Sequence, residues 1–289
     1  MTDGTAPSAR GLWELIEPVH AVTYFAPEAL DAFKDAGLRG FWRGYFAGRA
    51  APLGAVGPGP VQAAFFSFAP AMVARALPET WDRVPPHRAL EVRRAGAGAA
   101  LRRLLAGLED ETERAAAALM PLLDSLDCSG RVLAAANAAL PPPVDAVDRL
   151  WHATTVLREH RGDGHVAACV AAGLDGCETL VLRAGIDLPR GELQPFRGWT
   201  DAQWEAGGHR LAARGLLGPD GSATAQGRLL HRRVEEATDL AAARPWREQA
   251  PAAAGELARV LAPLAAAAAT ALRFPNPIGV PRPTGGPGA

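Results

Sequence analysis

Side chains that could do chemistry are densest between Arg158 and His165, a run that holds two arginines, two carboxylates and two histidines. If the run is helical, Arg161 and His165 are i, i+4 neighbours, and Glu159 and Asp163 form a second such pair. Two glycines within it weaken a helix by about 1 kcal/mol each relative to Ala. They predict either a bend or the close approach of a ligand or another backbone. The run therefore indicates a polar site, and the alternative is a linker helix whose charges pair with each other or with a dimer partner.

A second group, Glu17, His20 and Tyr24, lies near the N-terminus with spacings of three and four residues. These spacings place all three side chains along one stripe of a helix. A carboxylate that holds a histidine facing a tyrosine would suit proton transfer. The same arrangement would also suit a buried hydrogen-bond network without any chemistry.

A third group surrounds Arg49, which follows Tyr45 by one helical turn and Trp42 by two. An arginine among aromatic rings at a helix end could hold a carboxylate or a phosphate, or could stack on a ring. The neighbouring aromatic side chains are also typical of an ordinary core.

Taken together, these groups predict a small-molecule site in which a histidine transfers a proton, a glutamate orients that histidine, and an arginine holds an anionic group of the ligand. The predicted catalytic residues are Glu17, His20, Tyr24, Glu159, His160 and His165. The predicted ligand-binding residues are Trp42, Tyr45, Arg49, His152, Arg158, Arg161 and Asp163. No metal site is predicted, because His160 and His165 lack a standard pair spacing, and the cofactor is unknown.

The elements that must position these residues are mainly helical. Residues 1–140 are predicted to form an N-terminal helical domain that ends before the triplet Pro141-Pro142-Pro143, because three prolines cannot lie inside a helix. Residues 144–245 are predicted to form a long helix followed by a winged helix-turn-helix. In that unit Thr200 caps a helix, the stretch from Leu216 to Thr224 forms a small β-hairpin wing, and Thr224 caps the next helix. A C-terminal helix and a Pro/Gly-rich tail make up residues 246–289.

The composition is that of a globular protein, since 48% of the 289 residues are hydrophobic and 21% are charged. The net charge of −1 removes the strongest general argument for a nucleic-acid partner. No apolar run approaches the ~20 residues of a membrane helix, so no membrane association is expected. The three cysteines are an odd number without metal-ligand spacing, which fits a reducing cytoplasm.

The order of helices, the Asp-Gly turn and the Thr-x-x-Gly start of the following helix give the stretch from Leu211 to Leu229 a resemblance to MarR-type winged-helix regulators. The whole chain also resembles a family of actinobacterial helix-turn-helix proteins. The stretches that carry this likeness are Glu17–Glu28, Tyr45–Gly54, Leu157–His165, Arg197–Trp199, Thr238-Asp239 and Asn276–Gly279. This resemblance implies a fold that contains a winged helix, and it implies no particular activity.

The charges around the predicted recognition helix do not favour DNA. The helix from Thr200 to Arg214 carries two acidic residues against two arginines, and the predicted wing carries Asp220 and no basic residue. DNA-reading helices usually present basic and amide side chains to the major groove. The segment from Asp82 to Arg103 has a local charge of +4, which is more typical of a solvated helix face.

Two functions are favoured over a third, a non-catalytic interaction module, because polar residues are concentrated in the three groups above. The first is a winged-helix protein that binds a small molecule internally, and that could be an acid–base enzyme on a former DNA-binding scaffold. The alternative is a ligand-responsive DNA-binding transcriptional regulator, in which a homodimer presents two winged helices to DNA.

Overall fold

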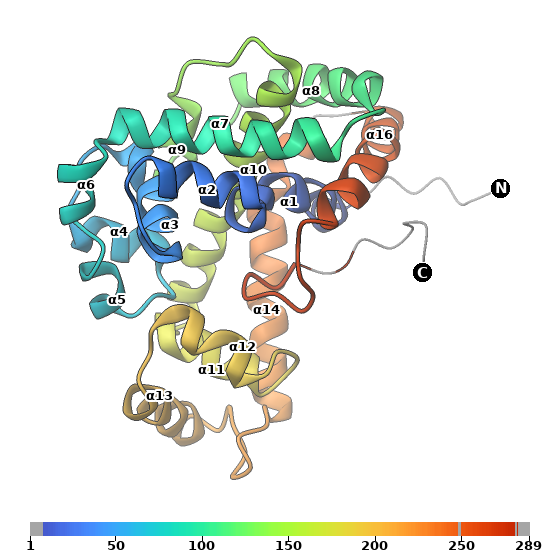
Figure 1. The fold of residues 1–289 in the computed structure, drawn as a ribbon. Helices are drawn as coiled ribbons and strands as arrows, with labels where there is room; N and C mark the ends of the chain where they lie inside the picture. Colours follow the sequence, from blue (N-terminus) through green and yellow to red (C-terminus); the bar gives the residue numbers. More distant parts are fainter. Residues whose placement is uncertain (1–7, 248–249, 281, 283–289) are drawn as a thin grey trace.

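The computed structural model describes residues 8–247, 250–280 and 282 as a mainly helical protein (Figure 1). Within these residues no strand is present, and the predicted mainly α fold class is confirmed. Residues 283–289, which include most of the predicted Pro/Gly-rich tail, lie outside the described part of the chain.

The N-terminal body contains nine helices within the described residues, several of which begin with proline in the first turn, where its fixed φ is already helical. They are α1 (Ala9–Phe25), α2 (Pro27–Asp35), α3 (Phe41–Ala50), α4 (Pro58–Phe65), α5 (Pro70–Ala74), α6 (Glu79–Arg83), α7 (Pro86–Leu104), α8 (Glu109–Asp124) and α9 (Val132–Ala138), with the 3-10 turn η1 (Ala51–Leu53) after α3.

Two hydrophobic cores hold this body together. In the first, α1 and α8 pack against α10 (Ala146–Ala171) and α16 (Pro251–Ala269) through aliphatic side chains such as Leu12, Leu119 and Leu261. The second core is aromatic and lies among α3, α4 and α5, where Phe46 and Phe68 are fully buried. The aromatic residues of the Arg49 segment thus belong largely to a core.

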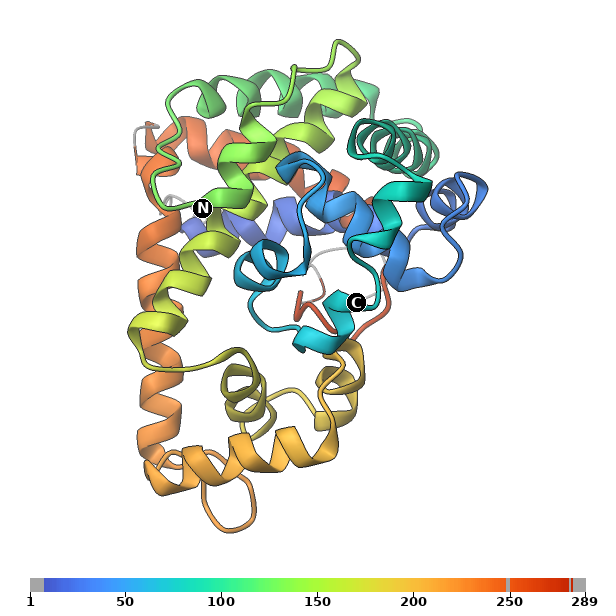
Figure 2. The same ribbon diagram turned by 90° about the vertical axis from the view of Figure 1, so that its left-hand side faces the viewer.

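Helix α10 extends from the N-terminal body to the lower part of the molecule (Figure 2). Asp145 caps its first turn by accepting hydrogen bonds from two backbone N–H groups. The helix continues through both glycines without a break. At Gly164 a Cβ atom would lie 2.7 Å from the guanidinium of Arg131, so the close neighbour is a side chain and not the predicted ligand or backbone.

The helix-turn-helix unit follows α10 and consists of α11 (Gly176–Ala184), α12 (Arg190–Leu193), η2 (Pro195–Arg197), α13 (Asp201–Ala213) and α14 (Ala225–Ala242). Thr200 caps α13 and Thr224 caps α14, as the sequence predicts. Gly227 must be glycine, since a Cβ atom would lie 2.2 Å from the carbonyl oxygen of Leu216. This close approach explains the Thr-x-x-Gly pattern.

The predicted β-hairpin wing is not formed as a pair of strands. Between α13 and α14 the chain makes a turn closed by a single isolated bridge between Leu217 and Ala223. Each arm is two or three residues long, and Pro219 lacks the N–H group that would extend the ladder. The wing is therefore reduced to one bridge, and a further hydrogen bond from Ala223 N–H to the Gly185 carbonyl fixes it to α11.

The C-terminal part returns to the N-terminal body. After the four-residue helix α15 (Arg244–Arg247), helix α16 has the length and hydropathy of a membrane span, contrary to the expectation from the sequence. In the structure its leucines are buried against α1 and α8, as in a core helix. Helices α10 and α11, taken together as one bent segment, also have the length and hydropathy of a membrane span, with a bend of 91° between them. The chain from 270 to 280 then runs back towards the helix-turn-helix unit (Figure 1).

Candidate functional site

A buried ion-pair network joins α3 to α10. Arg49 donates two hydrogen bonds to Glu159, with distances of 2.9 and 3.0 Å, and Arg158 donates a third to the same carboxylate at 2.9 Å. The Glu159 side chain is 2% exposed. Burial opposes ionisation of Glu159, but the two guanidinium groups hold its pKa well below the usual range. Glu159 is therefore an ionised carboxylate between two buried cations.

Helix α1 extends this network through Glu17. The carboxylate of Glu17 accepts hydrogen bonds from Trp13 Nε1 at 2.8 Å and from Arg158 Nε at 3.2 Å. On the α3 side, Arg49 also donates to the hydroxyl oxygen of Tyr45 at 3.2 Å. The structure thus brings together five predicted site residues, namely Glu17, Tyr45, Arg49, Arg158 and Glu159. Glu17 does not bond His20, although the sequence suggested that it would.

His20 is held instead by α10. Thr155 Oγ1 lies 2.9 Å from His20 Nδ1 and donates its own proton to the Trp151 carbonyl, so Nδ1 carries the proton that Thr155 accepts. His20 Nε2 then accepts from the hydroxyl of Tyr24 at 3.0 Å. Burial holds the pKa of His20 well below its usual range and raises that of Tyr24. Both ring nitrogens are occupied, which favours the interpretation of a buried hydrogen-bond network.

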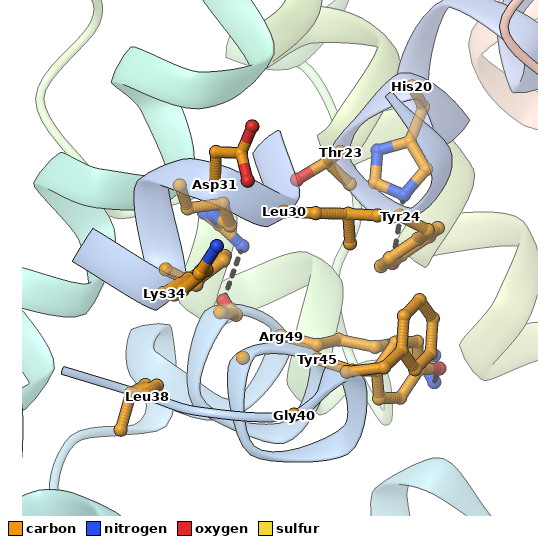
Figure 3. A pocket seen from close by; sticks show the side chains of 15 residues that line it. His20, Thr23, Tyr24, Leu30, Asp31, Lys34, Leu38, Gly40, Tyr45 and Arg49 are labelled. Carbon is orange, nitrogen blue, oxygen red and sulfur yellow. Dashed lines mark hydrogen bonds between the residues drawn. The ribbon is translucent and has the colours of Figure 1, made fainter. Parts of the chain in front are cut away.

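The first cavity of interest, the α1–α3 cavity, lies between α1, α2 and α3 and has a volume of about 200 Å³. Figure 3 shows His20 and Tyr24 on one side of it and Tyr45 and Arg49 on the other. The rest of its lining is largely aliphatic and aromatic, with Asp31 and Lys34 of α2 as the exposed charged members.

The second, the junction cavity, has a volume of about 180 Å³ and lies between the N-terminal body, α10 and the helix-turn-helix unit. Tyr45 contributes to both cavities. Pro277 and Ile278 of the C-terminal segment also line the junction cavity. Its charged or ionisable lining residues are Arg49, Arg158, His165, Arg183, Arg197, His231 and Glu235.

Arg197 is the arginine of this cavity that lacks a carboxylate partner among the described residues. It donates hydrogen bonds to Ser67 Oγ, the Phe196 carbonyl and the Pro277 carbonyl, at 3.3, 3.2 and 2.7 Å. The guanidinium also stacks over the ring of Phe68, 4.8 Å from its centroid. Burial lowers the pKa of Arg197 to about 10. Arg197 is therefore a buried cation in the wall of the junction cavity, and polar oxygen atoms rather than a carboxylate surround it in the described residues.

Glu235 lines both the junction cavity and an adjoining larger hollow of about 350 Å³. Glu235 pairs with Arg10 at 2.5 Å, and Arg161 pairs with Asp239 at 2.8 Å. His165 lines both hollows and shares a hydrogen bond of 3.0 Å with Thr238 Oγ1. Burial lowers its pKa to about 4, so His165 is neutral near pH 7.

Other predicted site residues lie apart from both cavities. His160 hydrogen-bonds the Asp127 carbonyl at 3.2 Å, and Asp163 accepts from the first N–H groups of α9. His152 is buried near Arg93 and lines neither cavity. Trp42 packs among aromatic side chains and lines a separate surface hollow. The predicted roles of these four residues in one shared site are therefore not supported by their positions.

The sequence missed Arg183 and Arg197, two cationic members of the junction cavity. Arg183 lies on α11 and pairs with Asp187 at 3.3 Å, and its side chain is 32% exposed. Both arginines belong to the helix-turn-helix unit, which begins after the last predicted site residue, His165. The tripeptide Arg197–Trp199, one of the stretches that carry the family resemblance, was a usable signal, since Trp199 and Arg197 both bond Ser67 in the N-terminal body. Within the described residues, no group of three potential metal ligands lies close together.

The arginines at α13 are held in ion pairs and hydrogen bonds and are not free cations on its surface. Arg210 pairs with Asp175 and Glu178 at 2.6 and 2.7 Å, and Arg214 donates to the Gly173 carbonyl at 2.7 Å. Asp201 is paired with Arg190 at 2.5 Å. The exposed face of α13 is thus nearly neutral and rich in alanine.

A profile of a helix-turn-helix family matches residues 9–275, which is nearly the whole of the described chain. The chain belongs to this helix-turn-helix family. Membership confirms the family type predicted from the sequence and indicates a DNA-binding type of fold, while the kinship with MarR regulators and an actinobacterial origin stay predictions. Comparison with curated proteins and with solved structures gave no match.

Proposed function

We propose that this helix-turn-helix protein binds a small molecule with a carboxylate or phosphate group in the junction cavity. The observation that carries the proposal is Arg197, a buried arginine that lines the cavity without a carboxylate partner among the described residues. An anionic group in the cavity would neutralise this charge. Arg49, Arg158 and Arg183 line the same cavity and would add charge-assisted hydrogen bonds.

The position of the cavity gives the proposed ligand a way to act on the helix-turn-helix unit. Arg49 comes from the N-terminal body, Arg158 from α10, and Arg183 and Arg197 from α11 and η2. A ligand that contacts all of them favours the arrangement in which these parts are close together. The protein is therefore proposed to be a ligand-responsive protein. This combines the internal small-molecule site of the first interpretation of the sequence with the ligand response of the alternative.

We propose that the protein binds the anion and does not act on it by acid–base catalysis. Of the histidines predicted to move a proton, His20 has both ring nitrogens in protein hydrogen bonds. His165 has a pKa of about 4, lowered by burial. A general base works best when its pKa is near the working pH.

The test is a thermal-shift and calorimetric titration with phosphate, pyrophosphate, succinate and citrate. At least one of these anions should bind, and Arg183→Gln should weaken its binding by about tenfold, because one charge-assisted hydrogen bond is lost. Arg183 is suitable because it is partly exposed, so its replacement leaves the core intact. Arg228→Gln, on the exposed surface of α14 and away from the cavity, is the matched control and should bind normally. Equal affinity in all three proteins would contradict the proposal.

The competing function is sequence recognition in DNA by α13. That function requires affinity for duplex DNA, which the ligand-binding proposal does not. Because the arginines of α13 are paired with α11, we expect no appreciable affinity for random duplex DNA at low salt. Fluorescence anisotropy with a labelled duplex at low and moderate salt measures this. Tight binding that falls steeply with salt would show that the helix-turn-helix unit is a DNA reader.

A further inference from the structure

The α1–α3 cavity has the features of a second ligand site, separate from the junction cavity. It is mainly apolar, with Phe33, Leu38 and Tyr45 in its lining. Leu30 and Phe41 also line it, and each is 39% exposed, which places apolar side chains where the cavity meets solvent. An apolar rim favours the entry of an apolar molecule. A cavity of about 150 Å³ suffices for benzene, so this one can hold a ring with a short substituent.

Arg93 gives this cavity a polar end. It comes from α7, lines the cavity, and is 6% exposed. Its guanidinium donates to the Gly48 carbonyl at 3.1 Å and to Asn137 Oδ1 at 3.0 Å, while its buried Nε has no partner in the structure. No carboxylate among the described residues is paired with it. Burial lowers the pKa of Arg93 to about 10, as expected of a cation without a counter-charge.

Two hydroxyl groups can supply further hydrogen bonds. Tyr45 accepts from Arg49, which leaves the proton of its own hydroxyl for another acceptor. Thr23 lines the cavity from α1, and its side chain points towards Leu30 and Tyr24 in Figure 3. Both groups are potential hydrogen-bond donors in the wall of the cavity.

We propose that the α1–α3 cavity binds a small hydrophobic carboxylic acid, with its apolar body among Leu30, Phe33 and Phe41 and its carboxylate towards Arg93. The acid would provide the negative charge that Arg93 lacks in the described structure. This site is independent of the junction cavity, which is lined by other arginines apart from the shared Arg49.

The experiment compares benzoate, phenylacetate and hexanoate with their neutral amides, by calorimetry on the full chain. At least one acid should bind more tightly than its amide by about 10- to 100-fold, because a buried charge pair is lost in the amide. Arg93→Gln should reduce this preference for the acid to near unity. If Arg93→Gln does not fold, the comparison of acid with amide in the unmodified protein still decides the matter.

Cavity variants locate the bound acid. Thr23→Leu fills part of the α1–α3 cavity with an apolar side chain and should abolish binding of the acid, whereas Arg183→Gln, in the junction cavity, should leave it unchanged. The proposal is overturned if none of the three acids binds, if acids and amides bind equally, or if Arg183→Gln abolishes binding and Thr23→Leu does not. The last result would assign the acid to the junction cavity and support the proposed function instead.

Discussion

Glu159→Gln is expected to lower the free energy of unfolding by about 3–5 kcal/mol, the cost of leaving buried charges without their partner. Glu159 is the carboxylate that Arg49 and Arg158 share, and all three side chains are largely buried. Glutamine has nearly the same shape, so the loss measures charge rather than packing. Urea denaturation followed by circular dichroism gives the free energy directly.

The matched control is Glu91→Gln. Glu91 pairs with Arg88 at 2.8 Å on an exposed face of α7, and exposed pairs contribute at most about 1 kcal/mol. If both variants lose the same small amount of stability, the Arg49–Glu159–Arg158 network is not the buried charge cluster described above. A large loss in the Glu159 variant alone agrees with it.

Acidification is expected to destabilise the protein at pH values where most of its carboxylates are still ionised. Burial lowers the pKa of His152 and of His160 to about 4, from an ordinary value of 6.5. These histidines therefore bind protons below about pH 6.5 in the unfolded chain, but only below about pH 4 in the folded chain. The free energy of unfolding falls as the pH is lowered across that interval. Each histidine contributes a loss of about 2 kcal/mol at pH 5.

Asp163 acts in the opposite direction. Burial raises its pKa to about 6, so the folded protein gains stability as this carboxyl takes up a proton. Burial also lowers the pKa of His165 to about 4 and that of His20 well below its usual range, so these two histidines add to the loss. The gain from Asp163 offsets about 1 kcal/mol of it, and we expect a net fall of about 4–6 kcal/mol between neutral pH and pH 5. Denaturation curves at the two pH values measure it. His160→Gln keeps a donor for the Asp127 carbonyl and should reduce the fall by about 2 kcal/mol; an unchanged fall would show that His160 does not titrate as described.

The parts of the fold that local sequence rules determine were predicted well. Thr200 and Thr224 cap the helices expected of them, and the long helix after the proline triplet begins at Ala146 with Asp145 as its cap. The wing was predicted wrongly, because an Asp-Gly turn between short apolar stretches looks the same whether or not strands form around it. Strand pairing depends on partners elsewhere in the chain, and here the partner is a single carbonyl of Gly185.

The candidate site was predicted in part. Glu17, Arg49, Arg158 and Glu159 do meet, as the residue types suggested. The sequence could not show which face of α10 each residue of the Arg158–His165 run would occupy, because the helix is surrounded by neighbours on several sides. His160 and Asp163 consequently point towards α9 and its preceding loop. Arg197 was missed because its role depends on a contact with a loop 130 residues earlier.

The most direct test of the junction cavity as an anion site is a crystal structure grown with the anion that gives the largest thermal shift among phosphate, pyrophosphate, succinate and citrate. We expect the anion between the helix-turn-helix unit and the N-terminal body, with an oxygen atom within hydrogen-bond distance of Arg197 and Arg183. An anion bound elsewhere, with water in the cavity and Arg197 still bonded to Ser67 and Pro277 alone, would contradict the account.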